Sequence, residues 1–125
     1  MAFTARVLLH ASLALLATAT WARAGTILAS GPLKIAANDS YSCTAVNVGA
    51  SDLAQVQVDV TVVGSNTGSG FKKTCSPLAA NGACEGSNQA GATQYRFCTV
   101  GVVGNRKNVR AAFCNTSTGD CLPLQ

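Results

Sequence analysis

The sequence has a single histidine, His10, a single tryptophan, Trp21, and only five acidic residues among 125. His10 and Trp21 both lie in an N-terminal segment that we expect to be cleaved off. Serine and cysteine hydrolases need a base, usually histidine, beside the nucleophile. Glycoside hydrolysis needs two neighbouring carboxyl groups, but among the acidic residues only Asp52 and Asp59 are close in sequence. The sequence therefore predicts a protein that is not an enzyme and has no catalytic residues.

Residues 1–24 have the three-part layout of a secretory signal peptide. Arg6 gives a positively charged start, residues 7–19 are mainly apolar, and small residues surround the end at Ala24. A membrane span needs about 20 apolar residues, and this run is shorter and has polar interruptions. We therefore expect cleavage after Ala24 and one domain over residues 25–125. The product is predicted to be secreted, periplasmic or on the cell surface, with no transmembrane segment after cleavage.

Residues 25–125 contain seven basic and five acidic residues, a net charge of +2. This charge is too weak and too scattered to indicate nucleic-acid binding, which uses a concentrated basic surface. The densest positive positions form a candidate weak patch for an anionic ligand. They are Lys72, Lys73, Arg106, Lys107 and Arg110. The alternative is two turns with solvated charges, which we favour because such short runs usually face water.

Six cysteines follow the expected cleavage site, and their spacing lacks the usual metal and redox motifs. Successive cysteines are separated by 31, 8, 13, 15 and 6 residues. Neither the short spacing of structural zinc sites nor a C-x-x-C redox motif is therefore present. An even number of cysteines in an exported chain predicts structural disulfides, with no metal and no cofactor.

Six cysteines can pair in many ways, and sequence alone does not select one. Turn-forming residues between neighbouring cysteines favour local pairs, because SPLAANGA and NTSTGD could each close a hairpin or loop. The two remaining cysteines would then form a long-range bridge. The preferred pairs are Cys43–Cys98, Cys75–Cys84 and Cys114–Cys121.

The clearest structural element is AQVQVDVTVV, residues 54–63, in which valines alternate with polar residues. This period of two is typical of a strand with one buried and one wet face. Residues 26–35 are expected to form one or two short strands, broken at Gly31 and Pro32. Further short strands are expected at 41–48, 72–76, 83–87, 93–103, 108–115 and 121–124. Residues 104–107 are expected to form a hairpin turn. Short strands separated by Gly, Asn and Ser predict an all-β antiparallel sandwich of about seven strands, stapled by disulfides.

The stretches SYSCTAVNVG, TCSPLAANGAC and YRFCTVGVVGNRKNVRAAF, together with the valine strand, resemble small exported bacterial proteins of immunoglobulin-like architecture. The resemblance implies a β-sandwich and an exported location, and it carries over no catalytic or binding residue. The Cys114–Cys121 pair lies outside the shared pattern. Residues 25–125 also lack the core tryptophan of antibody domains.

Three functions are consistent with these features. We expect a non-enzymatic interaction module of the envelope or extracellular space, which binds a protein or glycan partner through sheet edges or end loops. The first alternative is a structural subunit of a surface appendage or coat, assembled by strand addition. The second is a small secreted inhibitor or antimicrobial effector, a role that disulfides and a mild positive charge would suit.

Overall fold

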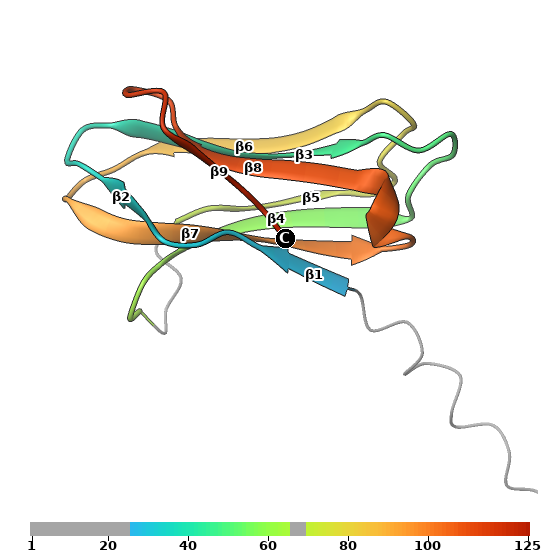
Figure 1. Cartoon of the computed structure of the whole chain (residues 1–125), viewed down its shortest axis with the longest axis horizontal. Helices are drawn as coiled ribbons and strands as arrows, with labels where there is room; N and C mark the ends of the chain where they lie inside the picture. The colour runs from blue at the N-terminus through green and yellow to red at the C-terminus, as the bar shows by residue number, and fades with distance from the viewer. Residues whose placement is uncertain (1–25, 66–69) are drawn as a thin grey trace, which may run out of the picture.

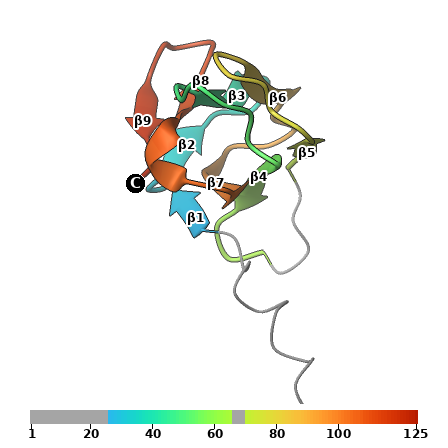
Figure 2. The ribbon, with the colours of Figure 1, turned by 90° about the vertical axis from the view of Figure 1, so that its right-hand side faces the viewer.

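Two antiparallel β-sheets lie face to face in the computed structural model, which describes residues 26–65 and 70–125 (Figure 1). The β4–β7 sheet consists of β1 (Thr26–Ala29), β2 (Leu33–Ile35), β7 (Gln94–Val103), β4 (Gln55–Val62) and β5 (Lys72–Cys75). The β3–β8 sheet consists of β6 (Ala83–Gln89), β3 (Ser40–Asn47), β8 (Val109–Asn115) and β9 (Cys121–Pro123). Figure 2 shows the two sheets end on, as separate layers. The predicted all-β antiparallel architecture is confirmed.

The described residues form nine strands, more than the roughly seven typical of such a sandwich. One extra strand arises because the chain breaks at Gly31 and Pro32, so that β1 and β2 pair separately with β7. The expected signal peptide, residues 1–24, lies outside the described residues. Within residues 26–65 and 70–125, no helix is long and apolar enough to cross a membrane.

The core lies between the sheets and is built largely from alternating valines. On β4, Val56, Val58 and Val60 are fully buried, while the residues between them are half-buried on the outer face. On β7, Val100 and Val102 face the same interior. Burying each such side chain contributes about 1.5–3 kcal/mol relative to leaving it exposed. The two-residue period predicted from the sequence therefore determines which face of β4 contacts the core.

Within the described residues, the chain changes sheet five times between consecutive strands. The changes lie between β2 and β3, β3 and β4, β5 and β6, β6 and β7, and β7 and β8. The expected hairpin at residues 104–107 is therefore wrong, because β7 pairs with β4 whereas β8 pairs with β3. A short 3-10 helix, η2 (Arg106–Asn108), carries the chain across, and the side chain of Asn105 caps it by accepting from the Lys107 amide at 3.0 Å. Gly104 has a φ of 135°, so the glycine allows the change of direction where other residues would be strained.

All three preferred disulfide pairs are confirmed: Cys43–Cys98, Cys75–Cys84 and Cys114–Cys121. The first two join the sheets, because β3 and β6 lie in one sheet and β7 and β5 in the other. The third joins β8 to its neighbour β9. With sequence separations of 55, 9 and 7 residues, the chain-entropy relation gives about 4, 2.6 and 2.4 kcal/mol of stabilisation respectively.

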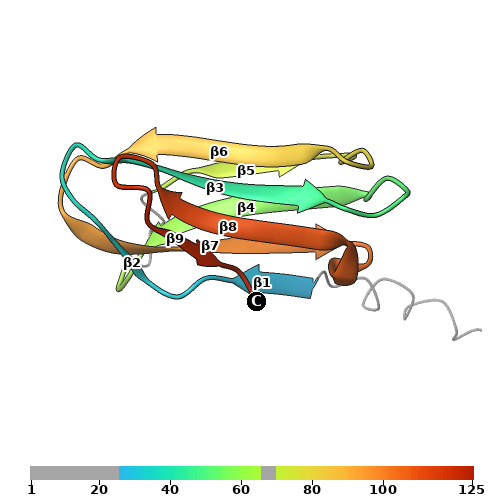
Figure 3. The ribbon, with the colours of Figure 1, turned by 45° about the horizontal axis from the view of Figure 1, so that its top comes forward.

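The last five residues, 121–125, cross from one sheet to the other and are called the C-terminal strap below. β9 pairs with β8, and the Leu124 amide donates to the Ala111 carbonyl at 3.0 Å. Gln125 then pairs with Ala29 of β1, with each amide donating to the other residue's carbonyl at 3.1 and 3.0 Å. Figure 3 shows the chain end beside β1. The strap therefore connects the two sheets along one side of the sandwich.

An aromatic cluster lies in the interior and extends from β8 to the gap between β5 and β6. Tyr41 stacks on Phe71, with ring centroids 5.9 Å apart, and meets Phe113 edge to face at 6.1 Å. The guanidinium of Arg96 lies 4.8 Å from the Tyr41 ring centroid and donates to the Tyr41 hydroxyl at 3.2 Å. Phe71 approaches the backbone of Gly86 so closely that a Cβ there would overlap the ring. Glycine at this position lets the ring close the gap between β5 and β6.

Asn47, at the end of β3, is fully buried and ties together two loops. Its amide nitrogen donates to the carbonyls of Ser51 and Leu78, at 2.9 and 3.1 Å, and its side-chain oxygen accepts from the Gly49 amide at 2.9 Å. A buried amide is tolerated only when its hydrogen bonds are satisfied, and here three are made. Asn47 thereby fixes one end of the sandwich.

Candidate functional site

The outer surface of the β4–β7 sheet carries a set of polar side chains from three adjacent strands. Because successive strand residues point to opposite faces, the buried valines of β4 leave the intervening residues pointing outward. The register then places Gln57 between Thr74 and Gly101, and Asp59 between Lys72 and Thr99. We call this set the polar face. It consists of Gln57, Asp59, Thr61, Lys72, Thr74 and Thr99.

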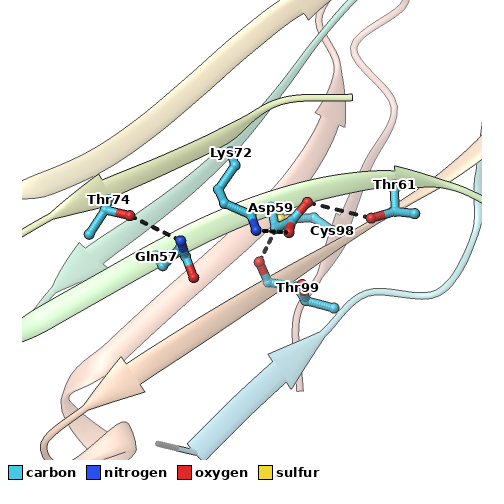
Figure 4. Close-up of polar contacts among 7 residues, drawn as sticks. All are labelled: Gln57, Asp59, Thr61, Lys72, Thr74, Cys98 and Thr99. Atoms are coloured by element: carbon cyan, nitrogen blue, oxygen red, sulfur yellow. Dashed lines mark hydrogen bonds and ion pairs between the residues drawn. The ribbon is translucent and has the colours of Figure 1, made fainter. Parts of the chain in front are cut away.

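Side chains on the polar face contact one another across the strands (Figure 4). The Gln57 amide nitrogen donates to the Thr74 hydroxyl at 3.0 Å, and the Thr61 hydroxyl donates to the Asp59 carboxylate at a long 3.5 Å. The Lys72 ammonium lies 3.6 Å from the other Asp59 oxygen, with 61% and 31% of the two side chains exposed. Exposed ion pairs contribute at most about 1 kcal/mol, so these contacts mainly orient the groups.

The remaining contact drawn in Figure 4 joins the Cys98 sulfur to the Thr99 carbonyl oxygen at 3.5 Å. Cys98 is bonded to Cys43, so its sulfur has no proton to donate and the contact is not a hydrogen bond. The inter-sheet disulfide therefore lies directly beneath Thr99 and anchors the centre of β7. The bridge therefore ties the strand that carries Thr99 to the opposite sheet.

The middle of this surface is open at Gly101. A Cβ built at Gly101 would have no atom within 4 Å, although its register partners, Ile27 on β1 and Gln57 on β4, flank it. The missing side chain lets a ligand approach the backbone of β7 between these neighbours. Gly101 therefore leaves a low point in an otherwise continuous layer of side chains.

Exposed apolar groups border the polar face. Ile27 is 64% exposed, and Tyr95 is 55% exposed on the same side of β7 as Thr99. Phe97 lies between Tyr95 and Thr99 on that side of β7 and is half-buried. Val63, just beyond β4, is exposed and donates its amide to the Tyr95 carbonyl at 2.9 Å. A tyrosine that presents both an apolar ring and a hydroxyl is well suited to a contact surface.

The structure does not bring the five predicted basic residues into one patch. Lys72 and Lys73 lie on β5, the edge of one sheet, whereas Arg106, Lys107 and Arg110 lie on η2 and β8, which belong with the other sheet. Lys72 pairs with Asp59, and the Arg110 guanidinium donates to the carbonyls of Lys107 and Val109 at 2.8 and 3.0 Å. These groups are therefore two separate positive regions.

The acidic residues are also dispersed. Within residues 26–65 and 70–125, no group of three or more histidine, cysteine or acidic side chains is arranged to hold a metal ion. The Asp39 carboxylate accepts from the side-chain amide of Asn115 at 2.8 Å, and the Asp52 carboxylate accepts from the backbone amide of Ala80 at 3.3 Å. The Asp120 carboxylate accepts from the Thr118 hydroxyl at 3.0 Å. These carboxylates support loops.

The sequence analysis identified the alternating strand at residues 54–63 but not the polar face. The alternation of β4 already placed Gln57, Asp59 and Thr61 on one outward side. The contributions of Thr74 and Thr99 depend on strand register, which no local pattern encodes. The chain matches no protein-family model, no curated protein and no solved structure.

Proposed function

We propose that this chain is an exported, non-enzymatic binding module that recognises a glycan through the polar face. The observation that carries the proposal is the combination on one sheet surface of a carboxylate, an ammonium, an amide and three hydroxyls. A hydroxyl-rich ligand offers donors and acceptors together and can therefore replace the contacts that these groups make with one another. Gly101 gives access to the backbone, and Tyr95 adds an aromatic ring at the border.

An exported location is supported by the three disulfides, which are stable in oxidising compartments and common in small secreted domains. The proposed family, small exported bacterial proteins of immunoglobulin-like architecture, shares the two packed sheets and an inter-sheet bridge. The strand order differs from the immunoglobulin order. In an immunoglobulin domain, strand F, which carries a cysteine of the inter-sheet bridge, shares a sheet with the strand that follows it, whereas β7, which carries Cys98, and β8 lie in different sheets. The proposed function therefore rests on the polar face and not on the family.

A panel of immobilised envelope polysaccharides tests the proposal, using protein secreted with its own N-terminal segment. In the double variant Gln57→Ala/Thr74→Ala, binding is expected to weaken roughly 5- to 100-fold, because two hydrogen bonds contribute about 1–3 kcal/mol. Ser87→Ala is the matched control, since Ser87 is exposed on β6 of the other sheet. Absence of binding to every polysaccharide, or equal binding by both variants, would contradict the proposal.

The two alternatives from the sequence have different requirements. An appendage subunit would pair a strand from one copy with a sheet edge of another, so sedimentation at high concentration would show a growing series of oligomers. An inhibitor would present a rigid loop, for which residues 75–84 are the candidate, and would block one enzyme of a protease panel. Glycan binding by a monomer with no inhibitory activity would separate our proposal from both.

A further inference from the structure

The three disulfides differ in how far solvent can reach them. Cys43, Cys98 and Cys84 are fully buried, so each inter-sheet bridge has at least one sulfur inside the core. Cys121 is exposed and Cys114 is half-buried. Thiol–disulfide exchange requires a thiolate to reach one of the two sulfurs. Access therefore favours attack on the Cys114–Cys121 bond, at the sulfur of Cys121.

The position of this bond explains its exposure. Cys114 and Cys121 are direct register partners on β8 and β9. Phe113, the neighbour of Cys114, is fully buried. Because adjacent strand residues point to opposite faces, the disulfide lies on the outer surface of the β3–β8 sheet. It therefore makes little contribution to the packed interior and can open without a cavity forming there.

The bond restrains the C-terminal strap, residues 121–125. Beyond Cys121, the strap is held by the short strand β9, by burial of Leu124, which is 8% exposed, and by the Gln125–Ala29 pair. Isolated pairing of so few residues is weak because ordering each backbone unit costs conformational entropy. The Cys114–Cys121 disulfide closes a loop with a sequence separation of 7. This closure shifts the equilibrium between the bound and the released strap toward the bound form by a factor on the order of 50.

We propose that Cys114–Cys121 is a thiol–disulfide exchange site whose reduction releases the C-terminal strap while the two inter-sheet bridges stay closed. The partner is an external dithiol. One of its thiolates attacks the Cys121 sulfur to form a mixed disulfide, and Cys114 leaves as a thiolate and takes up a proton. The second thiol of the partner then displaces Cys121, which also becomes a thiol. Two electrons pass to the protein, and the dithiol becomes a disulfide.

Release of the strap would uncover the edge of β8 and the edge of β1, which the strap pairs with in the closed form. Both edges would then present unpaired amides and carbonyls, and such edges pair readily with another chain. Reduction would thereby convert a closed side of the sandwich into an acceptor for an added strand. The Cys114–Cys121 bond itself lies on the opposite sheet from the polar face, so its reduction can be tested without a glycan.

Stepwise reduction of the wild-type protein with dithiothreitol tests the proposal. After alkylation, peptide mass mapping should show Cys114 and Cys121 labelled at dithiothreitol concentrations at least tenfold lower than those needed for Cys43, Cys84 and Cys98. The Ala29 amide donates to Gln125 and the Leu124 amide donates to Ala111, so both hydrogen bonds hold the strap in place. Hydrogen exchange of these two amides should then accelerate about 50-fold, while exchange in β4 is unchanged.

The variant Cys114→Ser/Cys121→Ser is a second measurement, and it should reproduce the fast exchange of Ala29 and Leu124 without any reductant. Simultaneous reduction of all three bonds would overturn the proposed selectivity. Selective reduction that left both amides protected would overturn the proposed release of the strap. Because the first experiment uses wild-type protein, the proposal is tested even if the serine variant does not fold.

Discussion

Replacing Gly86 by alanine tests the packing between β5 and β6. A Cβ at Gly86 would overlap the Cε2 atom of Phe71 and lie 3.0 Å from its Cζ atom. Phe71 stacks on Tyr41, which is itself 1% exposed, so the ring has little room to withdraw. Overpacking of this kind costs about 1–3 kcal/mol. In a domain of this size, that loss corresponds to a decrease in Tm of roughly 5–20 °C.

Gly101 provides the matched control, because it also lies within a strand but has open space where its Cβ would be. Alanine there reduces the entropy of the unfolded chain and should leave stability unchanged or raise it by up to about 1 kcal/mol. Urea unfolding with the disulfides intact would measure both variants. Equal stability of Gly86→Ala and wild type, or a larger loss for Gly101→Ala than for Gly86→Ala, would refute the packing argument.

Three further predictions concern single interactions. Asn47→Ala should lower the free energy of unfolding by about 2–4 kcal/mol, because it removes three hydrogen bonds made by a fully buried side chain and leaves a void in its place. A loss below about 0.5 kcal/mol in urea unfolding would contradict this. A double-mutant cycle on Asp59 and Lys72 should give a coupling below about 1 kcal/mol that disappears in 1 M salt, and a coupling insensitive to salt would be inconsistent with an exposed pair. Cys43→Ala/Cys98→Ala should cost about 4 kcal/mol or more by calorimetry, and an unchanged Tm would show that this bridge does not restrain the unfolded chain.

The elements that the sequence predicted well are those encoded by local chemistry. The alternation of valines and polar residues in β4 is visible in the sequence because a strand with one buried face requires it. Turn residues between Cys75 and Cys84, and between Cys114 and Cys121, indicated that each of these two pairs forms a disulfide. With those four cysteines assigned, Cys43 and Cys98 were left to pair. Each of these features depends on residues near one another in the chain or on elimination.

The features that the sequence did not predict depend on contacts between distant segments. Gly104 and Asn105 suit a tight hairpin and a change of sheet equally well, so their presence did not distinguish the two. The polar face required the register of β4 with β5 and β7. Gly86 lay within the strand expected at 83–87, and only the position of Phe71 shows why a side chain is excluded there.

The repeated passage of the chain between sheets has a consequence for the timing of folding. Among the strands of residues 26–65 and 70–125, only two consecutive pairs, β4 with β5 and β8 with β9, are hydrogen-bonded neighbours, so most pairings must wait until remote segments meet. Sandwiches with such topologies fold in about milliseconds to seconds, far more slowly than helical bundles. During that time the valine-rich segments of the unfolded chain would be exposed and could associate with other chains.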